Sequence, residues 1–157
     1  MSEQLTNSQL LLRTVAMPAD TNANGDIFGG WIMSQMDLAG GILAKKVSQG
    51  RTVTVAVDQI VFHRPVQVGD VVCCHGRVVR SGTTSVTIEL QIWVNPILRD
   101  DEHQRLNVTS ANFVYVAIDD HGQKRPLPRE NQGLLAHAQL PAGSDEKQAS
   151  ASQGKAS

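Results

Sequence analysis

Aromatic residues are scarce in this chain, at 4% of 157 residues, and the formal net charge is only -1. The core must therefore rest on Val, Ile, Leu and Met. The near-neutral charge argues against non-specific nucleic-acid binding, which needs a basic surface. No apolar run reaches the ~18 residues that a membrane-spanning helix needs. The start of the chain, MSEQLTNSQ, lacks the basic residues and apolar stretch of a signal peptide. We therefore expect a cytoplasmic protein.

Cysteines and metal-binding patterns are also nearly absent. The only cysteines, Cys73 and Cys74, are adjacent, and successive strand residues point to opposite faces, so they cannot share a metal ion in the Cys-x-x-Cys manner. Two free thiols fit a reducing compartment. A nucleophile formed by one of them with His75 is less common than a small buried core thiol. The histidines are scattered without metal-ligand spacing, so we predict no metal site.

The most informative stretch runs from Met17 to Lys46, where a polar loop rich in Asn, Asp and Gly leads into a periodic apolar segment. The residues that recur there at helical spacing are Ile32, Met36, Ala39 and Leu43. This pattern predicts a helix that begins at the Gly29-Gly30 pair and ends near residue 48. At ~100° per residue, Asp37 falls at one edge of the apolar arc. Placing a carboxyl group beside apolar residues costs free energy, so Asp37 either has hydrogen-bond partners that offset the cost or has a catalytic role.

Two glycine pairs bear on the role of this acid. Gly40 and Gly41 lie inside the predicted helix, where each costs about 1 kcal/mol relative to alanine, so a sheet, a second chain or a ligand is expected to approach closely. Gly29 and Gly30 leave main-chain N–H groups unobstructed at the helix N-terminus, where they would stabilise negative charge developing on an oxygen. With a carboxylate two turns on, this suggests acyl transfer or hydrolysis. Alternatively, the first pair only marks the helix start and Asp37 faces solvent or an interface. These residues alone leave the two interpretations balanced.

Five stretches with alternating or Val-rich apolar residues accompany this helix. They predict strands at residues 10–16, 53–63, 70–80, 84–94 and 108–118. One strand, one helix and four further strands joined by turns cannot wind as βαβ units. The helix must therefore cover one face of an antiparallel sheet, which is an α+β fold. A sheet with one helix on one side leaves an edge strand and a flank unpaired, which favours dimerisation.

The length of the chain is ordinary for one domain. We expect residues 1–9 to be flexible and residues 10–140 to form the domain, with a short helix at 131–140. Residues 141–157 are small and polar with almost nothing to bury, so disorder is expected there.

The segment TNANGDIFGGWIMSQMDLAGG, followed by VTVAVDQIVFHRPVQVGDVV and RPLPRE, resembles the hotdog-fold acyl-CoA thioesterases, closest to the bacterial YciA-type subgroup. The resemblance covers roughly residues 10–131. Its first segment is the specific part, because the Phe-x-x-Pro-x-x-x-Gly-Asp element (Phe62, Pro65, Gly69, Asp70) recurs across hotdog proteins. The resemblance implies a hotdog fold, in which a curved antiparallel sheet of five or more strands wraps a long central helix. It also implies homodimers, often as trimers of dimers, and thioester hydrolysis without metal or organic cofactor.

The resemblance also implies roles for single residues. The catalytic acid on the helix matches Asp37, and an assisting Asn in the preceding loop matches Asn22, fifteen positions earlier. The family typically contributes these two residues from different subunits. Without the family, Asn22 would be interpreted as a turn residue and could not be separated from its near rivals Asn24 and Asp26. Asp37 would deprotonate a water molecule or attack the thioester carbonyl itself, with the oxyanion at Gly30, and the sequence leaves both routes open.

Coenzyme A carries a diphosphate and a 3′-phosphate, so its nucleotide end needs cations or exposed N–H donors. The candidates are Arg64, the hairpin residues Arg80, Ser81 and Gly82, and the pair Arg125 and Arg129, although each arginine alone is more often a solvated charge. At the helix start, Gly29 and Phe28 are expected to contact the substrate, with Phe28 and Trp31 as acyl-tunnel walls. Asp58 is a second acid, but a mid-strand Asp more often faces water or an interface.

The leading prediction is therefore an acyl-CoA thioesterase that releases a free acid and coenzyme A. One rival is a non-catalytic hotdog module that binds acyl-CoA as a sensor, which would need an output domain that is not evident here. Another is a hydratase or dehydratase, which is disfavoured because hotdog dehydratases use a His at the helix start and this chain has Ile27-Phe28-Gly29-Gly30 there. The sequence does not give the acyl chain length, the physiological substrate or the assembly beyond a dimer.

Overall fold

The computed structural model of the protein describes residues 6–96 and 104–136. In chain order the main elements are β1 (Gln9–Val15), α2 (Gly29–Ser48), β2 (Thr52–Val57), β3 (Val71–Ser81), β4 (Ser85–Asn95) and β5 (Leu106–Ala117). Two 3-10 turns, η1 (Pro18–Asp20) and η2 (Arg129–Asn131), complete the order. The tail expected at 141–157 lies outside the described residues, and the domain limits of 10 and 140 stay a prediction.

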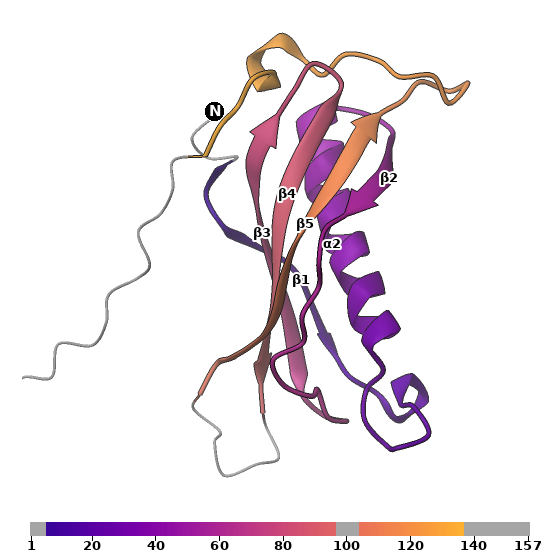
Figure 1. The fold of residues 1–157 in the computed structure, drawn as a ribbon, viewed down its shortest axis with the longest axis vertical. Helices are drawn as coiled ribbons and strands as arrows, with labels where there is room; N and C mark the ends of the chain where they lie inside the picture. Colours follow the sequence, from indigo (N-terminus) through magenta and orange to yellow (C-terminus); the bar gives the residue numbers. More distant parts are fainter. Residues whose placement is uncertain (1–5, 97–103, 137–157) are drawn as a thin grey trace, which may run out of the picture.

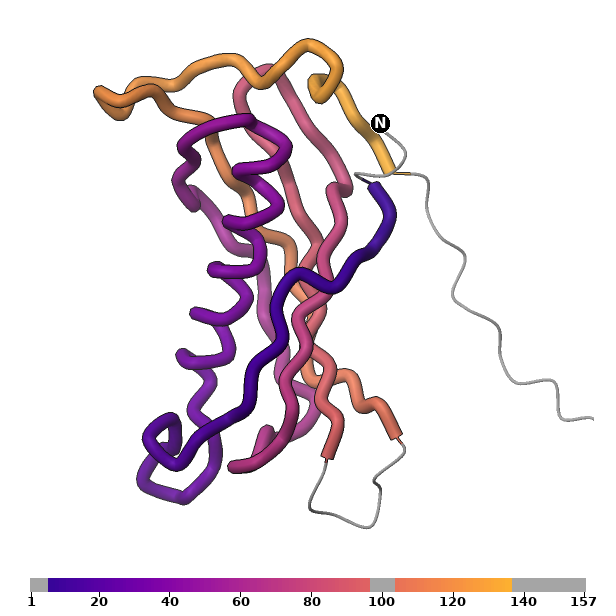
Figure 2. Tube along the Cα trace, turned by 180° about the vertical axis from the view of Figure 1, so that it is seen from behind, coloured from indigo at the N-terminus to yellow at the C-terminus, as the bar shows by residue number. Residues whose placement is uncertain are grey.

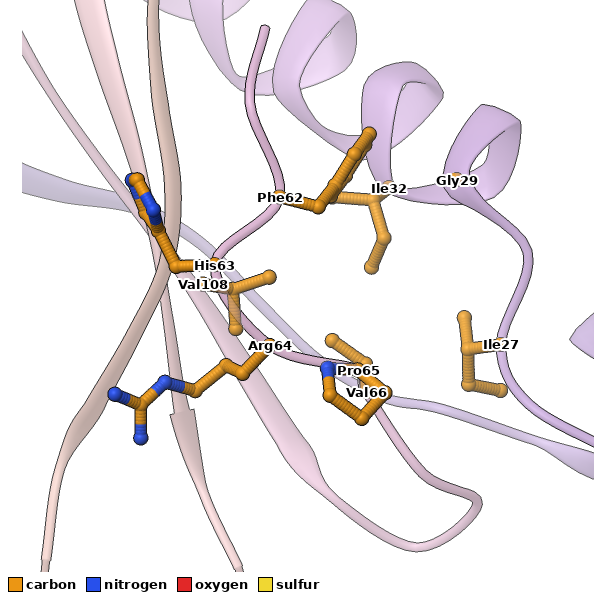
Figure 3. A pocket seen from close by; sticks show the side chains of 9 residues that line it. All are labelled: Ile27, Gly29, Ile32, Phe62, His63, Arg64, Pro65, Val66 and Val108. Carbon is orange, nitrogen blue, oxygen red and sulfur yellow. The ribbon is translucent and has the colours of Figure 1, made fainter.

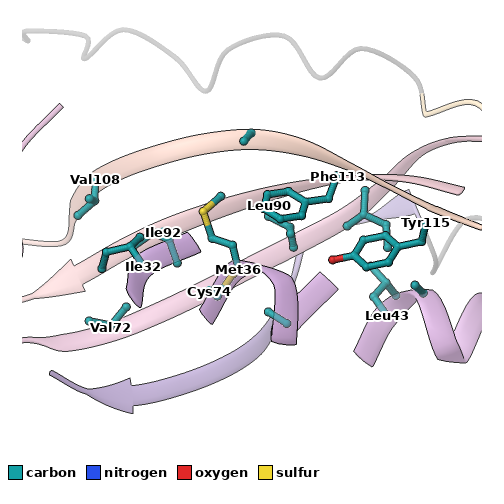
Figure 4. Packing of buried hydrophobic residues seen from close by; sticks show 14 of the residues in the cluster. Ile32, Met36, Leu43, Val72, Cys74, Leu90, Ile92, Val108, Phe113 and Tyr115 are labelled. Carbon is teal, nitrogen blue, oxygen red and sulfur yellow. The ribbon is translucent and has the colours of Figure 1, made fainter. Parts of the chain in front are cut away.

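The five strands form one antiparallel sheet in the order β1-β3-β4-β5-β2, and α2 runs along one face of it (Figures 1 and 2). The core lies between helix and sheet, where inward residues of β3, β4 and β5 meet the apolar side of α2 (Figure 4). This arrangement confirms the predicted α+β fold with one long helix against a five-stranded antiparallel sheet. The edges of the sheet are β1 and β2, and β2 lies beside the helix without a strand on its outer side.

The helix begins and ends where the sequence predicts. Its C-terminus is marked by Gln49, which adopts the left-handed conformation at φ 53°. Two lysines in the last turn interact favourably with the negative end of the helix dipole. The glycine pair within α2 has two different surroundings. A Cβ at Gly40 would collide with the Tyr115 hydroxyl and come within 2.9 Å of Leu90, whereas a Cβ at Gly41 would meet nothing within 4 Å. The sheet therefore requires glycine only at position 40.

The predicted strand at 53–63 is wrong in its second half, because β2 ends at Val57. At the next residue, the Asp58 carboxylate accepts hydrogen bonds from the main-chain and side-chain N–H groups of Asn112, both at 2.8 Å. The chain then leaves the regular ladder, held to β5 by isolated bonds such as His63 N–H to the Val108 carbonyl at 2.9 Å. Residues 58–66 consequently form a wall beside the start of α2 instead of a longer strand.

The Gly69-Asp70 element forms the turn that leads into β3. Gly69 has a φ of 89°, which favours glycine, and the Asp70 carboxylate accepts the main-chain N–H of Gln67 at 3.0 Å. This part of the hotdog pattern therefore has a structural role.

The helix expected at 131–140 is also wrong for the described residues 131–136, which contain no α-helix. The segment instead bonds to the end of β3, where β1 no longer pairs with it. Leu134 accepts the main-chain N–H of Ser81 at 2.9 Å, and Ala136 donates to the Val79 carbonyl at 3.0 Å. Main-chain bonds at an open sheet edge thus outweigh the weak helical pattern. Within the described chain, no helix is long and apolar enough to cross a membrane.

An apolar surface remains uncovered along α2 and β2. It consists of the exposed side chains of Met33, Leu38, Ile42, Val53, Val55 and Val57. We refer to these six residues as the exposed apolar face. Exposed apolar side chains beside an unpaired edge strand are typical of a protein-protein contact.

Candidate active site

Asp37 lies two turns into α2, on the side that faces β2 and β5. Its Oδ1 atom accepts a hydrogen bond from the Thr54 hydroxyl at 2.6 Å and another from the Tyr115 hydroxyl at 3.1 Å. The Tyr115 hydroxyl also lies 3.2 Å from the main-chain carbonyl oxygen of Asp37. Within residues 6–96 and 104–136, no Lys, Arg or His forms an ion pair with this carboxylate. Among the described residues, Asp37 is therefore held by neutral hydroxyl donors alone.

The protonation of Tyr115 follows from the same contacts. Burial raises the pKa of its hydroxyl far above the ordinary value of 10.0, and the adjacent Asp37 carboxylate raises that pKa further. The hydroxyl therefore stays protonated at neutral pH and acts as a donor towards the carboxylate.

A cavity of about 360 Å³ opens near the first turn of α2 (Figure 3). Its lining residues are Ile27, Gly29, Ile32, Phe62, His63, Arg64, Pro65, Val66 and Val108. Most of this wall is apolar, and the guanidinium of Arg64 extends away from Ile27 and Ile32 (Figure 3). The cavity thus combines a slot for an apolar group with a cation on one side. It brings together two of the predicted substrate contacts, Gly29 and Arg64.

The start of α2 is closely surrounded by aromatic rings. A Cβ at Gly29 would lie 3.3 Å from the Phe62 ring, and a Cβ at Gly30 would lie 2.8 Å from the Phe28 ring. No side chain caps this end of the helix. Glycine therefore lets the two rings pack against the helix start, where no described side chain bonds to the first N–H groups. Unpaired N–H groups at a helix N-terminus are what an oxyanion site requires.

Asn22 lies in the loop before α2, where its Oδ1 atom accepts the main-chain N–H groups of Asn24 at 2.9 Å and Asp26 at 3.2 Å. These are the turn contacts that the residue pattern alone predicts. In the described chain no hydrogen bond joins Asn22 to Asp37. Along the helix axis, Asp37 lies about 11 Å from Gly29 and Gly30 at 1.5 Å per residue. Asp37 and the first turn of the same helix are therefore too far apart to act on one carbonyl group.

The hairpin residues Arg80, Ser81 and Gly82 lie at the other end of the sheet. The length of β3, about 33 Å, separates them from the cavity. Ser81 is buried, and its hydroxyl donates to the Asn131 carbonyl at 2.6 Å and accepts the Leu134 N–H at 2.9 Å. Within one chain, the structure does not bring this group together with Arg64.

Arg125, another predicted phosphate ligand, binds the main chain. Its guanidinium donates to the carbonyl oxygens of Ser48 at 2.9 Å and Ile118 at 3.0 Å. Glycine at position 50 leaves room for this guanidinium, because a Cβ there would collide with it. Arg125 thus fastens the C-terminal end of α2 to the segment after β5.

The cysteines are buried, as expected of small core thiols. Burial, followed by the effect of Cys73, raises the pKa of the Cys74 thiol to about 12, so Cys74 is not a ready nucleophile. No group of three or more His, Cys, Asp or Glu side chains in the described ranges could hold a metal ion.

Comparison with known proteins decides the family. A sequence model of the Thioesterase superfamily matches residues 24–98. The acyl-CoA thioester hydrolase YciA of Salmonella typhimurium is 58% identical over 120 residues, which cover 76% of this chain and 90% of that protein. The chain belongs to the YciA family of acyl-CoA thioester hydrolases.

Two solved structures of thioesterases extend the comparison. HI0827, described as a hexameric broad-specificity acyl-coenzyme A thioesterase, is 53% identical with a TM-score of 0.76, covering 81% of this chain and 86% of that one. The hexameric thioesterase y2039 from Yersinia pestis is 56% identical with a TM-score of 0.75, covering 79% and 99%. The predicted resemblance and the hotdog fold are thereby confirmed.

Two residues of this YciA-family site were missed by the sequence analysis. Thr54 belongs to a strand whose valines suggest an apolar inner face, yet the valines are exposed and Thr54 contacts the helix. The alternation of Thr and Val in TVTVAV was the available signal. Tyr115 is the only tyrosine of the chain, but nothing in its neighbourhood in sequence indicates that its hydroxyl reaches Asp37.

Proposed function

We propose that the protein hydrolyses acyl-CoA thioesters to a free carboxylic acid and coenzyme A, with Asp37 as general base. Membership of the YciA family supports the substrate class. The geometry of the Asp37 carboxylate supports its role as the base, because Oδ1 accepts two hydroxyl hydrogen bonds while Oδ2 has no hydrogen-bond partner in the described chain. A carboxylate with one oxygen occupied and one open is suited to take a proton from a water molecule.

In the proposed reaction, Oδ2 of Asp37 removes a proton from water as the water oxygen bonds to the thioester carbonyl carbon. The carbonyl electron pair moves to the oxygen, and the resulting oxyanion is stabilised by N–H groups at Gly29 and Gly30, assisted by the Asn22 amide. The intermediate collapses when the C–S bond breaks. The departing thiolate takes the proton from Asp37, which yields coenzyme A and restores the carboxylate.

The proposed site is shared between two copies of the chain. Asp37 and the oxyanion donors of one helix lie about 11 Å apart, so the donors must come from a second copy that brings its helix start beside Asp37. The exposed apolar face and the unpaired edge strand β2 provide a surface for that copy. We propose a homodimer as the smallest active unit and a trimer of dimers as its assembly, in line with hexameric relatives.

Within this site we assign the acyl group to the cavity beside Gly29 and the polar part of coenzyme A to the side of Arg64. The nucleotide end of coenzyme A would be contacted by the hairpin residues of a neighbouring copy, namely Arg80, Ser81 and Gly82. The proposed chemistry uses neither a metal nor an organic cofactor. We also propose a cytoplasmic location, since two unpaired cysteines fit a reducing compartment.

The test is thiol release from a panel of acyl-CoA esters by the wild-type protein and Asp37→Asn. We expect release with the wild type and a kcat at least ~100-fold lower with Asp37→Asn, the low end for loss of a general base. Asp120→Asn, which changes an exposed carboxylate in a turn, is the matched control and should leave kcat unchanged. A folded Asp37→Asn with full turnover would remove Asp37 from the mechanism. Absence of thiol for every chain length would favour the sensor, and a new double bond without thiol would favour the dehydratase.

A further inference from the structure

Tyr115 is the buried partner of the Asp37 carboxylate. It lies on β5 with 2% of its surface exposed, and its ring stacks near that of Phe113 with centroids 6.4 Å apart. Figure 4 shows it among the side chains packed between the sheet and α2. Its hydroxyl nevertheless reaches two oxygen atoms of Asp37, at 3.1 Å and 3.2 Å. A group this deeply buried does not contact substrate, so any effect on the reaction must pass through Asp37.

The approach of this hydroxyl to the helix depends on Gly40. A side chain at position 40 would occupy the place of the Tyr115 oxygen. The carbonyl of Asp37 lies within the helix, where it accepts the N–H of the residue four positions later. The single hydroxyl hydrogen of Tyr115 is therefore best used by the charged carboxylate, since hydrogen bonds to ionised acceptors are the stronger ones.

We infer that Tyr115 is a positioning residue that, together with Thr54, fixes the Asp37 carboxylate so that Oδ2 faces the attacking water. The two donors come from β5 and β2 and meet at Oδ1. The orientation of a side chain on the helix is thus set by the sheet. The inference rests on the proposed general-base role of Asp37.

Tyr115→Phe tests this role because it removes the hydroxyl and retains the stacked ring. We expect kcat to fall about tenfold, as for the loss of one hydrogen bond to a charged group, with KM changed less than about twofold because Tyr115 does not contact substrate. Both quantities are read from thiol release measured over a range of acyl-CoA concentrations.

Ser48→Ala is the matched control. It removes another buried hydroxyl, which bonds to the Gly50 carbonyl at 3.0 Å near the end of α2. It should lower the melting temperature without changing kcat or KM. Introducing Tyr115→Phe into Asp37→Asn should lower kcat no further, because the hydroxyl acts through the carboxylate.

The outcomes separate this inference from the proposed function. If Asp37→Asn is inactive and Tyr115→Phe keeps the wild-type kcat, Tyr115 has only a structural role and the inference is overturned. If Asp37→Asn retains full turnover, the general-base proposal itself fails. If Tyr115→Phe does not fold, Gly40→Ala displaces the same hydroxyl and should lower kcat while KM changes less than about twofold. A wild-type kcat in that variant also overturns the inference.

Discussion

The two sides of α2 are both apolar, but only one is covered by the chain's own sheet. On the covered side, Met36 and Leu43 are 0% and 1% exposed, whereas on the other side Leu38 and Ile42 are 60% and 52% exposed. Asp37 lies where these two sides meet. The comparison indicates that one chain completes its fold by itself, whereas the surface around the carboxylate stays open for the second copy that we propose.

The largest expected effect is complementation between two inactive variants. Asn22→Ala and Asp37→Ala should each lower kcat at least ~100-fold alone. When equal amounts of both chains assemble at random, half of the dimers are mixed and one of their two sites is intact, so about a quarter of wild-type turnover should return. Co-expression with two different affinity tags, followed by thiol-release assays, measures this recovery.

Mixing Asp37→Ala with Asp37→Asn is the control, because no combination of these chains restores a carboxylate. If the mixture of Asn22→Ala and Asp37→Ala recovers no activity although mixed oligomers are present, the two residues do not act across an interface. If Asn22→Ala alone is fully active, Asn22 has only the turn contacts with Asn24 and Asp26.

A charge on the uncovered side of α2 should break the assembly and leave the covered side intact. Leu38→Glu would bury an unpaired carboxylate in the proposed interface, and we expect the dissociation constant of the oligomer to rise at least about tenfold. Sedimentation velocity measures the assembly, and circular dichroism checks that the chain remains folded. Gln123→Glu, in an exposed turn, is the control for added charge. An unchanged oligomer in Leu38→Glu would place the contact between copies elsewhere.

The adjacent glycines Gly40 and Gly41 allow the covered and uncovered sides of α2 to be compared at neighbouring positions. Gly40→Ala should lower the free energy of unfolding by about 1–3 kcal/mol, because overpacking against Tyr115 and Leu90 outweighs the better helix propensity of alanine. Gly41→Ala meets nothing within 4 Å in its own chain, so we expect a gain of up to about 1 kcal/mol. Urea unfolding of the two variants gives both values. A loss of stability in Gly41→Ala would show that a second copy packs against this position.

The sequence predicts the helix and the α+β arrangement well because both depend on local periodicity. The bounds of α2 follow from its apolar spacing and its flanking glycines, and the family follows from the segment around Asp37. The errors arise where distant groups compete for hydrogen bonds. Asn112 ends β2 at Val57, and the open end of β3 binds residues 134–136 in place of a helix.

The carboxylate environment was not predictable for a related reason. Thr54 and Tyr115 lie 17 and 78 positions after Asp37, and only the packing of β2 and β5 against α2 brings their hydroxyls to one oxygen atom. The roles of Asn22, Gly29 and Gly30 and of the phosphate candidates stay predictions, since in our proposal they depend on contacts between copies of the chain.

The hydrogen bonds of Arg125 restrict the motion of one end of α2. Because the guanidinium ties the carbonyl of Ser48 to that of Ile118, fraying at this end would break charged hydrogen bonds as well as helical ones. The opposite end has no side-chain cap, so the slowest amide hydrogen exchange should lie in the second half of α2 and the fastest in its first turn. A substrate that enters beside Gly29 can thus perturb the loose end of the helix while the far end remains anchored.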